Sequence, residues 1–236
     1  MLLTDSMIFS LNEEEIGVDG NICPGKMLHL FQDIAGKHAE KFGMGFDDLI
    51  ENNLIWVVTR IRFCTYGAFE AHKTYKLVTY PLPKQSLLYL RDYYIYDEND
   101  NLLVKGSSQW CILDFVSRKI QRTTLDYDGE FYETKAFDDG FPKLKINGEL
   151  PEIGSHQIDE KDLDNNAHTN NCRYAEMVEE FSDVKIYNEF NITFQKETRL
   201  GDVILFYKEK VDDGEIVTGK LEDGTVVFTA RLSYNQ

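Results

Sequence analysis

The sequence predicts an α+β fold in which one unit, a helix followed by several strands, occurs twice. Each half contains one amphipathic helical stripe, followed by strand-like runs rich in Val, Ile, Tyr and Phe. The halves also align loosely: residues 61–63 (Ile-Arg-Phe) resemble residues 192–194 (Ile-Thr-Phe), and residues 19–24 resemble residues 164–169. Periodicity alone therefore gives an α+β chain with an internal repeat.

The two helices are predicted from their apolar spacing. The first covers residues 24–42, begins with a proline at a position that tolerates one, and has a single stripe formed by Met27, Leu30, Phe31, Ile34 and His38. The second covers residues 171–181, and Thr169 or Asn170 is suited to be its N-cap. Its stripe is formed by Tyr174, Met177, Val178 and Phe181.

Strands are predicted after each helix. In the first half they cover residues 55–63, 74–80, 87–96 and 102–114, and in the second half residues 190–195, 203–211, 216–221 and 226–234. Asp-Asp-Gly at 212–214 and Glu-Asp-Gly at 222–224 are typical hairpin turns. The acidic, irregular stretch 123–149 predicts a long crossing connection. We expect a first repeat at 1–130, a linker at 131–150 and a second repeat at 151–236.

Composition excludes several classes of function. The 236 residues have a formal net charge of −16, which disfavours binding to nucleic acid and to anionic membranes. No apolar run approaches the roughly 20 residues that span a bilayer, and residues 1–12 lack the features of a signal peptide, so we expect a cytoplasmic protein. The four cysteines are scattered without a CxxC pair, which argues for reduced thiols and against a zinc site, and no cofactor motif is present.

One segment has the spacing of a chemical site. Asp164, Asn166 and His168 occupy alternate positions directly before the second helix. In an extended stretch these side chains project together, while Asn165 and Ala167 face away. The adjacent helix N-terminus would favour a carbonyl oxygen that becomes negative during attack. Taken alone, the same pattern is also typical of a capping loop.

These residues resemble a known family. The run Asp-Leu-Asp-x-Asn-x-His-x-Asn-Asn-x-x-Tyr at 162–174 is similar to the signature of the fatty acyl-ACP thioesterases, including the plant plastid enzymes, and would make this chain a bacterial member. The stretch Phe-Gln-Lys-Glu-Thr at 194–198 resembles the family's strand with a catalytic glutamate. Further similarities lie at residues 53–60, 107–110 and 117–119. The resemblance implies a tandem (double) hotdog fold, two sheets that each wrap a helix.

The resemblance also implies four catalytic residues, Asp164, Asn166, His168 and Glu197. We expect Glu197 or Asp164 to be the general base, His168 to carry the proton and Asn166 to position the substrate. By itself, Glu197 would be an ordinary surface charge; the joint pattern favours a site. Plant enzymes have a cysteine where this chain has Thr198, so a covalent cysteine route through that position is excluded and attack by water is favoured. We expect Cys172 to be structural.

The implied reaction is hydrolysis of acyl-acyl carrier protein to free fatty acid. Acyl carrier protein is acidic and would be repelled by the net charge, so a local basic patch is required, either Arg118, Lys119 and Arg122 or Lys143 and Lys145. Acyl-CoA hydrolysis and non-catalytic acyl binding are the alternatives. A homodimer is left open, because the duplication already supplies paired repeats. In the resembling family the acyl chain enters the first repeat between its helix and sheet, which makes Met27, Phe31, Ile34, Trp56 and the strand 93–96 candidate lining residues, although each is more typical of ordinary core.

Overall fold

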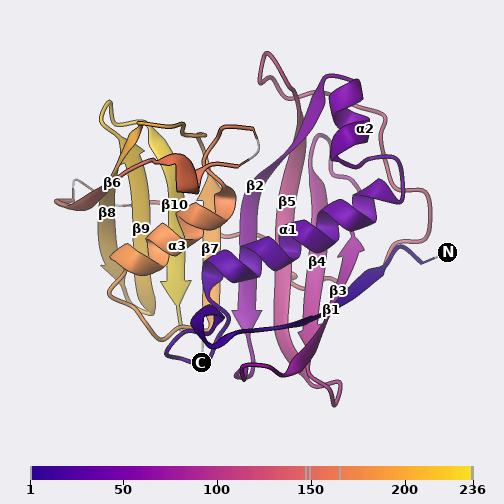
Figure 1. Ribbon diagram of the computed structural model, residues 1–236, viewed down its shortest axis with the longest axis horizontal. Coiled ribbons are helices and arrows are strands. Elements are labelled where there is room, and N and C mark those ends of the chain that lie inside the picture. Colours follow the sequence, from indigo (N-terminus) through magenta and orange to yellow (C-terminus); the bar gives the residue numbers. More distant parts are fainter. Residues whose placement is uncertain (1, 147, 149, 165, 235–236) are drawn as a thin grey trace.

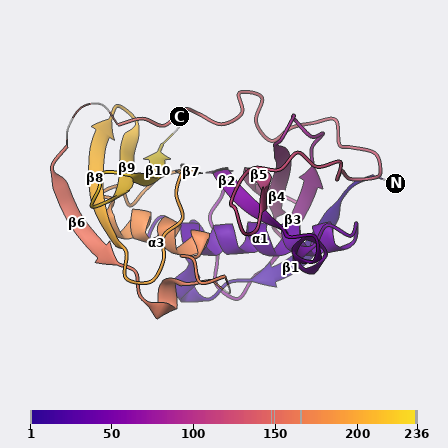
Figure 2. The ribbon, with the colours of Figure 1, turned by 90° about the horizontal axis from the view of Figure 1, so that it is seen from above.

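The computed structural model describes residues 2–146, 148, 150–164 and 166–234. In these residues ten strands form one sheet in the order β1-β3-β4-β5-β2-β7-β10-β9-β8-β6, and every neighbouring pair is antiparallel (Figure 1). The two long helices lie on one face of this curved sheet (Figure 2). The predicted class, helices packed on antiparallel strands, is therefore what the chain forms.

The first repeat supplies one half of the sheet. Its helices are α1 (Pro24–Glu40) and the short α2 (Phe46–Glu51), and its strands are β1 (Asp5–Ser10), β2 (Leu54–Thr65), β3 (Thr74–Pro81), β4 (Tyr89–Tyr96) and β5 (Leu102–Asp114). The apolar stripe of α1 is buried against the strands, and the ring of Phe31 stacks on that of Tyr93 with centroids 4.0 Å apart. Burial of this stripe fixes the helix on the sheet.

The second repeat supplies the other half. It contains α3 (Asn171–Phe181) and the strands β6 (Glu152–Gln157), β7 (Glu189–Phe194), β8 (Val203–Val211), β9 (Gly214–Leu221) and β10 (Val226–Ser233). Met177 and Val178 of α3 are buried against the strands, and Asn170 caps the helix, because its side chain accepts a hydrogen bond from the Cys172 amide. The predicted bounds of this helix are confirmed, and of the two N-cap candidates, Thr169 and Asn170, it is Asn170 that caps the helix.

The repeats meet at the pair β2 and β7. Ile61 lies opposite Ile192, the two residues that the sequence alignment equates, so the central ladder is symmetric about this pair. Phe63 lies opposite Phe190, and their rings stack with centroids 5.2 Å apart. The helices α1 and α3 also contact each other. One continuous core therefore joins the two repeats.

The segment between β5 and β6 crosses the face of the sheet opposite the helices (Figure 2). It contains no helix or strand among its described residues, as expected for a connection. Polar contacts attach it: the Ala136 amide donates to Asp92 at 2.7 Å, and Arg62 donates to the Gly140 carbonyl at 2.6 Å. In the described part of the chain, no helix is both long and apolar enough to cross a membrane.

Candidate active site

A cavity of about 640 Å³ lies where the two repeats meet. The first repeat contributes residues 55–59 of β2 and the end of β5, and the second contributes the loop before α3 and the loop after β7. All four sequence-predicted residues are on its wall: Asp164, Asn166, His168 and Glu197. Asn171, the first residue of α3, is there as well, so the amide end of this helix faces the same space.

The loop that holds three of these residues is a tight turn, and the prediction of an extended stretch is wrong. Asp164 and His168 close the turn with a backbone hydrogen bond of 2.7 Å, and Ala167 has a φ of 57°. The Asp164 carboxylate accepts hydrogen bonds from the amides of Asn166 at 2.7 Å and His168 at 3.1 Å. An Asp side chain competes effectively for amides two to four residues on, which explains the turn. The prediction for Asn165 lies outside the described residues.

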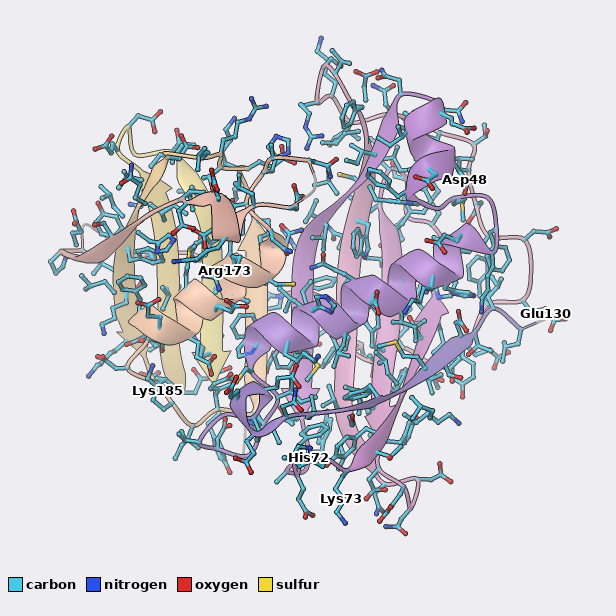
Figure 3. The ribbon with its side chains drawn as sticks, in the orientation of Figure 1. Asp48, His72, Lys73, Glu130, Arg173 and Lys185 are labelled. Carbon is cyan, nitrogen blue, oxygen red and sulfur yellow. The ribbon has the colours of Figure 1, made fainter. Side chains whose placement is uncertain are left out.

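The ionic contacts of Asp162, a buried residue two positions before the turn, hold the turn in place. Asp162 is fully buried and accepts hydrogen bonds from His156 Nε2 at 2.7 Å and from Arg173 Nε at 2.9 Å. Arg173 reaches it from the first turn of α3 (Figure 3). Burial raises the pKa of Asp162, but the bonds from His156, the Asp159 amide and Arg173 together hold it below its ordinary value. The loop and the helix are thereby locked together.

A second set of hydrogen bonds brings His168 and Glu197 face to face. The residues that follow them, Thr169 and Thr198, are buried and their hydroxyl oxygens lie 2.7 Å apart. The Thr169 amide donates to the Thr198 carbonyl at 2.9 Å, and the Tyr174 hydroxyl lies 2.8 Å from Thr198 Oγ1. In consequence His168 Nε2 lies 3.8 Å from Glu197 Oε2. Sequence reasoning missed the role of Thr169, because the contact joins residues far apart in the chain.

Comparison with known proteins identifies the family. The family model described as the acyl-ACP thioesterase N-terminal domain matches residues 4–131, and the model of the C-terminal domain matches residues 152–230. The chain belongs to the acyl-ACP thioesterase family.

Two curated relatives are chloroplastic plant proteins of this family. A palmitoyl-acyl carrier protein thioesterase of Gossypium hirsutum is 24% identical over 211 residues, which cover 81% of this chain and 50% of the relative. An oleoyl-acyl carrier protein thioesterase of Coriandrum sativum is 23% identical over 222 residues, with coverage of 86% and 58%. The chain thus spans about half the length of the curated relatives it matches.

Solved structures of acyl-ACP thioesterases share the fold. The structure from Bacteroides thetaiotaomicron superposes with a TM-score of 0.85 at 19% identity, over 99% of this chain and 98% of that one. The 12:0-ACP thioesterase of Umbellularia californica gives 0.85 at 20% identity, over 99% and 97%. The predicted tandem hotdog fold is confirmed.

Thr198, which follows Glu197, is fully buried and offers a hydroxyl rather than a thiol. The remaining thiols near the cavity are unsuited to nucleophilic attack, because burial raises the pKa of Cys172 to about 12 and also raises that of Cys111. Among the described residues there is no group of three or more His, Cys, Asp or Glu side chains placed to hold a metal ion. The Glu197 carboxylate and the His168 imidazole, which face each other at 3.8 Å, can activate a water molecule between them.

The apolar cavity of the first repeat lies nearer to α2 than predicted. It has a volume of about 220 Å³, and its wall includes Ala39, Met44, Trp56 and Trp110. Of the residues expected to line an acyl slot, Trp56 does so and also borders the larger cavity. Met27, Phe31, Ile34 and Tyr93 are instead packed core, because the stacked rings of Phe31 and Tyr93 fill the space between α1 and the sheet.

Proposed function

We propose that this chain hydrolyses acyl-acyl carrier protein to free fatty acid and holo-acyl carrier protein, as a step of fatty acid biosynthesis. The observation that carries the proposal is the facing pair His168 and Glu197, in a cavity between the repeats of a chain that belongs to the acyl-ACP thioesterase family. The curated relatives are named as enzymes with this activity. The alternatives of acyl-CoA hydrolysis and non-catalytic acyl binding are outcomes of the test below.

The contacts of the two carboxylates favour Glu197 as general base. The Asp164 carboxylate is occupied by two backbone amides, which makes it the residue that holds the loop. Glu197 has one oxygen toward His168, and 38% of its side chain is exposed to solvent, so water reaches it. In this scheme Glu197 takes a proton as water attacks the thioester carbonyl carbon. The carbon–sulfur bond then breaks, and His168 protonates the departing thiolate.

The remaining groups would orient the substrate. Asn166 is on the cavity wall and offers an amide to the carbonyl oxygen or to the pantetheine arm. The N-terminal end of α3 at Asn171 favours the negative charge that develops on the carbonyl oxygen. Asp164, Asn166, His168 and Glu197 thus act as one catalytic unit in the proposal.

We further propose that the two repeats have different roles in binding and catalysis. The first repeat, residues 1–130, would hold the acyl chain in the apolar cavity that meets the site at Trp56, and the second, residues 151–236, would supply the catalytic residues, with residues 131–150 as linker. Apolar walls and a few polar groups at one end are typical of sites for acyl chains.

The rim of the site suits an acidic carrier protein. Basic residues Lys119, Arg122, Lys196 and Arg199 lie on or beside the segments that form the cavity mouth. The turn between β5 and the linker also exposes Phe115, Val116 and Ile120. A mixed basic and apolar surface offers both long-range attraction and a desolvated contact to an acidic helix.

One assay tests the function. Purified protein is supplied with acyl-acyl carrier protein and with acyl-CoA of the same chain, and wild type is compared with His168→Ala and Glu197→Ala. Cleavage of the carrier-protein thioester, lost by roughly 100-fold or more in both variants, is expected. Preference for acyl-CoA would support acyl-CoA hydrolysis instead, and cleavage of neither thioester would support acyl binding without catalysis.

A cytoplasmic location and a homodimer are further proposals. Cell fractionation tests the location, and light scattering tests the oligomeric state.

A further inference from the structure

The turn that follows β5 brings an arginine into the site. Arg118 closes this turn, because its amide donates to the Asp114 carbonyl at 3.0 Å and the Ser117 amide donates to Asp114 Oδ1 at 2.7 Å. The φ of Arg118 is 57°, a left-handed conformation that costs a residue with a side chain on the order of 1 kcal/mol. The side chain lines the cavity that holds His168 and Glu197.

The guanidinium contacts one oxygen of Glu197 and leaves the other toward His168. Arg118 Nη2 donates to Glu197 Oε1, while Glu197 Oε2 lies 3.8 Å from His168 Nε2. One carboxylate is thus held between a cation of the first repeat and an imidazole of the second. The sequence analysis included Arg118 in a candidate basic patch for the carrier protein, whereas the structure directs its side chain into the cavity. A sequence does not show in which direction the side chain of a turn residue points.

Glu197 is the one side-chain partner of Arg118 among the described residues. The Nε and Nη1 atoms of the arginine are shielded from solvent and have no acceptor in that part of the chain. An arginine that anchored the fold would use several of its five donors. The contact of Arg118 is therefore directed at the proposed general base rather than at the scaffold.

We propose that Arg118 is a positioning residue that fixes the carboxylate of Glu197 for catalysis. This inference rests on the proposed function. A glutamate has three rotatable bonds, and a side chain that is 38% exposed would otherwise sample solvent-facing rotamers. With Oε1 held by the guanidinium, Oε2 stays between His168 and the attacking water.

The test uses the left-handed backbone of the turn. In Arg118→Gly the new residue adopts a φ of 57° without strain, so the variant keeps its fold and thermal stability. We expect kcat on acyl-acyl carrier protein to fall roughly 10- to 100-fold while KM changes less than about twofold. Added ethylguanidinium should restore part of kcat, and Arg118→Lys should be intermediate.

Arg231 provides the matched control. It is a partly exposed arginine of β10 that pairs with a single carboxylate, Asp213, and it is absent from the cavity wall. Arg231→Ala should retain both kcat and KM. Wild-type kcat in Arg118→Gly, or a rise in KM alone, would overturn the positioning role and leave the enzyme function standing. A wild-type protein that cleaves no thioester would overturn both.

Discussion

Thr198 shows how one hydroxyl can set the geometry of a site that it does not enter. It is fully buried and hydrogen-bonded to Thr169 and Tyr174, and these bonds hold the neighbouring Glu197 opposite His168. Thr198→Val keeps the shape but removes the hydroxyl, so Thr169 and Tyr174 lose a buried partner. We expect a loss of about 1–3 kcal/mol of unfolding free energy and a lower kcat. Thr198→Ser, which keeps the hydroxyl, should retain activity; if both variants behave alike in urea unfolding and in turnover, the hydrogen bonds are not what matters.

His38 links the stability of the first repeat to pH. Burial, followed by the charge of Arg91 at 2.9 Å, lowers the pKa of His38 from 6.5 to about 4. The unfolded chain takes up the proton near pH 6.5 and the folded chain only near pH 4, so stability is lost as the pH falls through this range. The contribution is roughly 3 kcal/mol, at about 1.4 kcal/mol per pKa unit. Urea unfolding at pH 7 and pH 5 measures the part of this contribution that is lost above pH 5, about 2 kcal/mol. His38→Gln should show a smaller drop than wild type, and an equal drop would refute the assignment.

At the scale of elements, length and apolar content decided what the sequence could predict. The stripes of α1 and α3 are long enough for a 3.6-residue period to be visible, and the bounds of α3 agree with the prediction. The elements that were missed, β1, β6 and α2, have six residues each, and the first two carry polar residues at the edges of the sheet. The strand β7 also has six residues, but it is mostly buried and was predicted from its apolar run. A short segment that is also polar is defined by its neighbours rather than by its own pattern.

Two glycines of α1 give opposite expectations for the same substitution. A Cβ at Gly36 meets no atom within 4 Å, so Gly36→Ala should gain the helix propensity of alanine, about 1 kcal/mol. A Cβ at Gly25 would lie 2.4 Å from Glu176 Cγ on α3, so Gly25→Ala must displace the Glu176 side chain, which pairs with Arg173, and should lower stability. Thermal unfolding of both variants checks the pair. A loss of stability in Gly36→Ala would show that its helix position is not as open as described.

At the scale of the whole molecule, the loop before the helix occurs twice, at residues 19–24 and 164–169. Of these two loops, only the second contains a histidine. In the first repeat the Asn21 amide donates to Asp19 Oδ1 at 2.9 Å, as the Asn166 amide does to Asp164 at 2.7 Å. Cys23 follows where the second repeat has His168, and burial raises the pKa of this thiol to about 11. The motif and the repeat were visible in the sequence. The convergence of Arg118, His168 and Glu197 was not, because it depends on how β5, α3 and β7 come together across the repeat interface.

Charge at the scale of the whole molecule makes the docking proposal testable. With a net charge of −16, the average field repels an acidic carrier protein, so the basic rim must supply the local attraction. The double variant Lys119→Glu with Arg122→Glu should raise KM for acyl-acyl carrier protein roughly tenfold, leave kcat on a small acyl thioester unchanged, and weaken the dependence of KM on salt.

The other basic pair of the sequence, Lys143 and Lys145 in the linker, is the matched comparison for this rim. Lys143→Glu with Lys145→Glu produces the same change in net charge in the linker, where neither lysine is next in sequence to a residue of the cavity wall, whereas Lys119 lies between the wall residues Arg118 and Ile120. If the rim binds the carrier protein, this variant changes KM for acyl-acyl carrier protein by less than about twofold, because exposed charges farther than a Debye length of about 8 Å are screened at physiological salt. Equal effects of the two double variants would mean that net charge alone governs the encounter. A larger effect of the linker pair would move the docking site to the opposite face of the sheet.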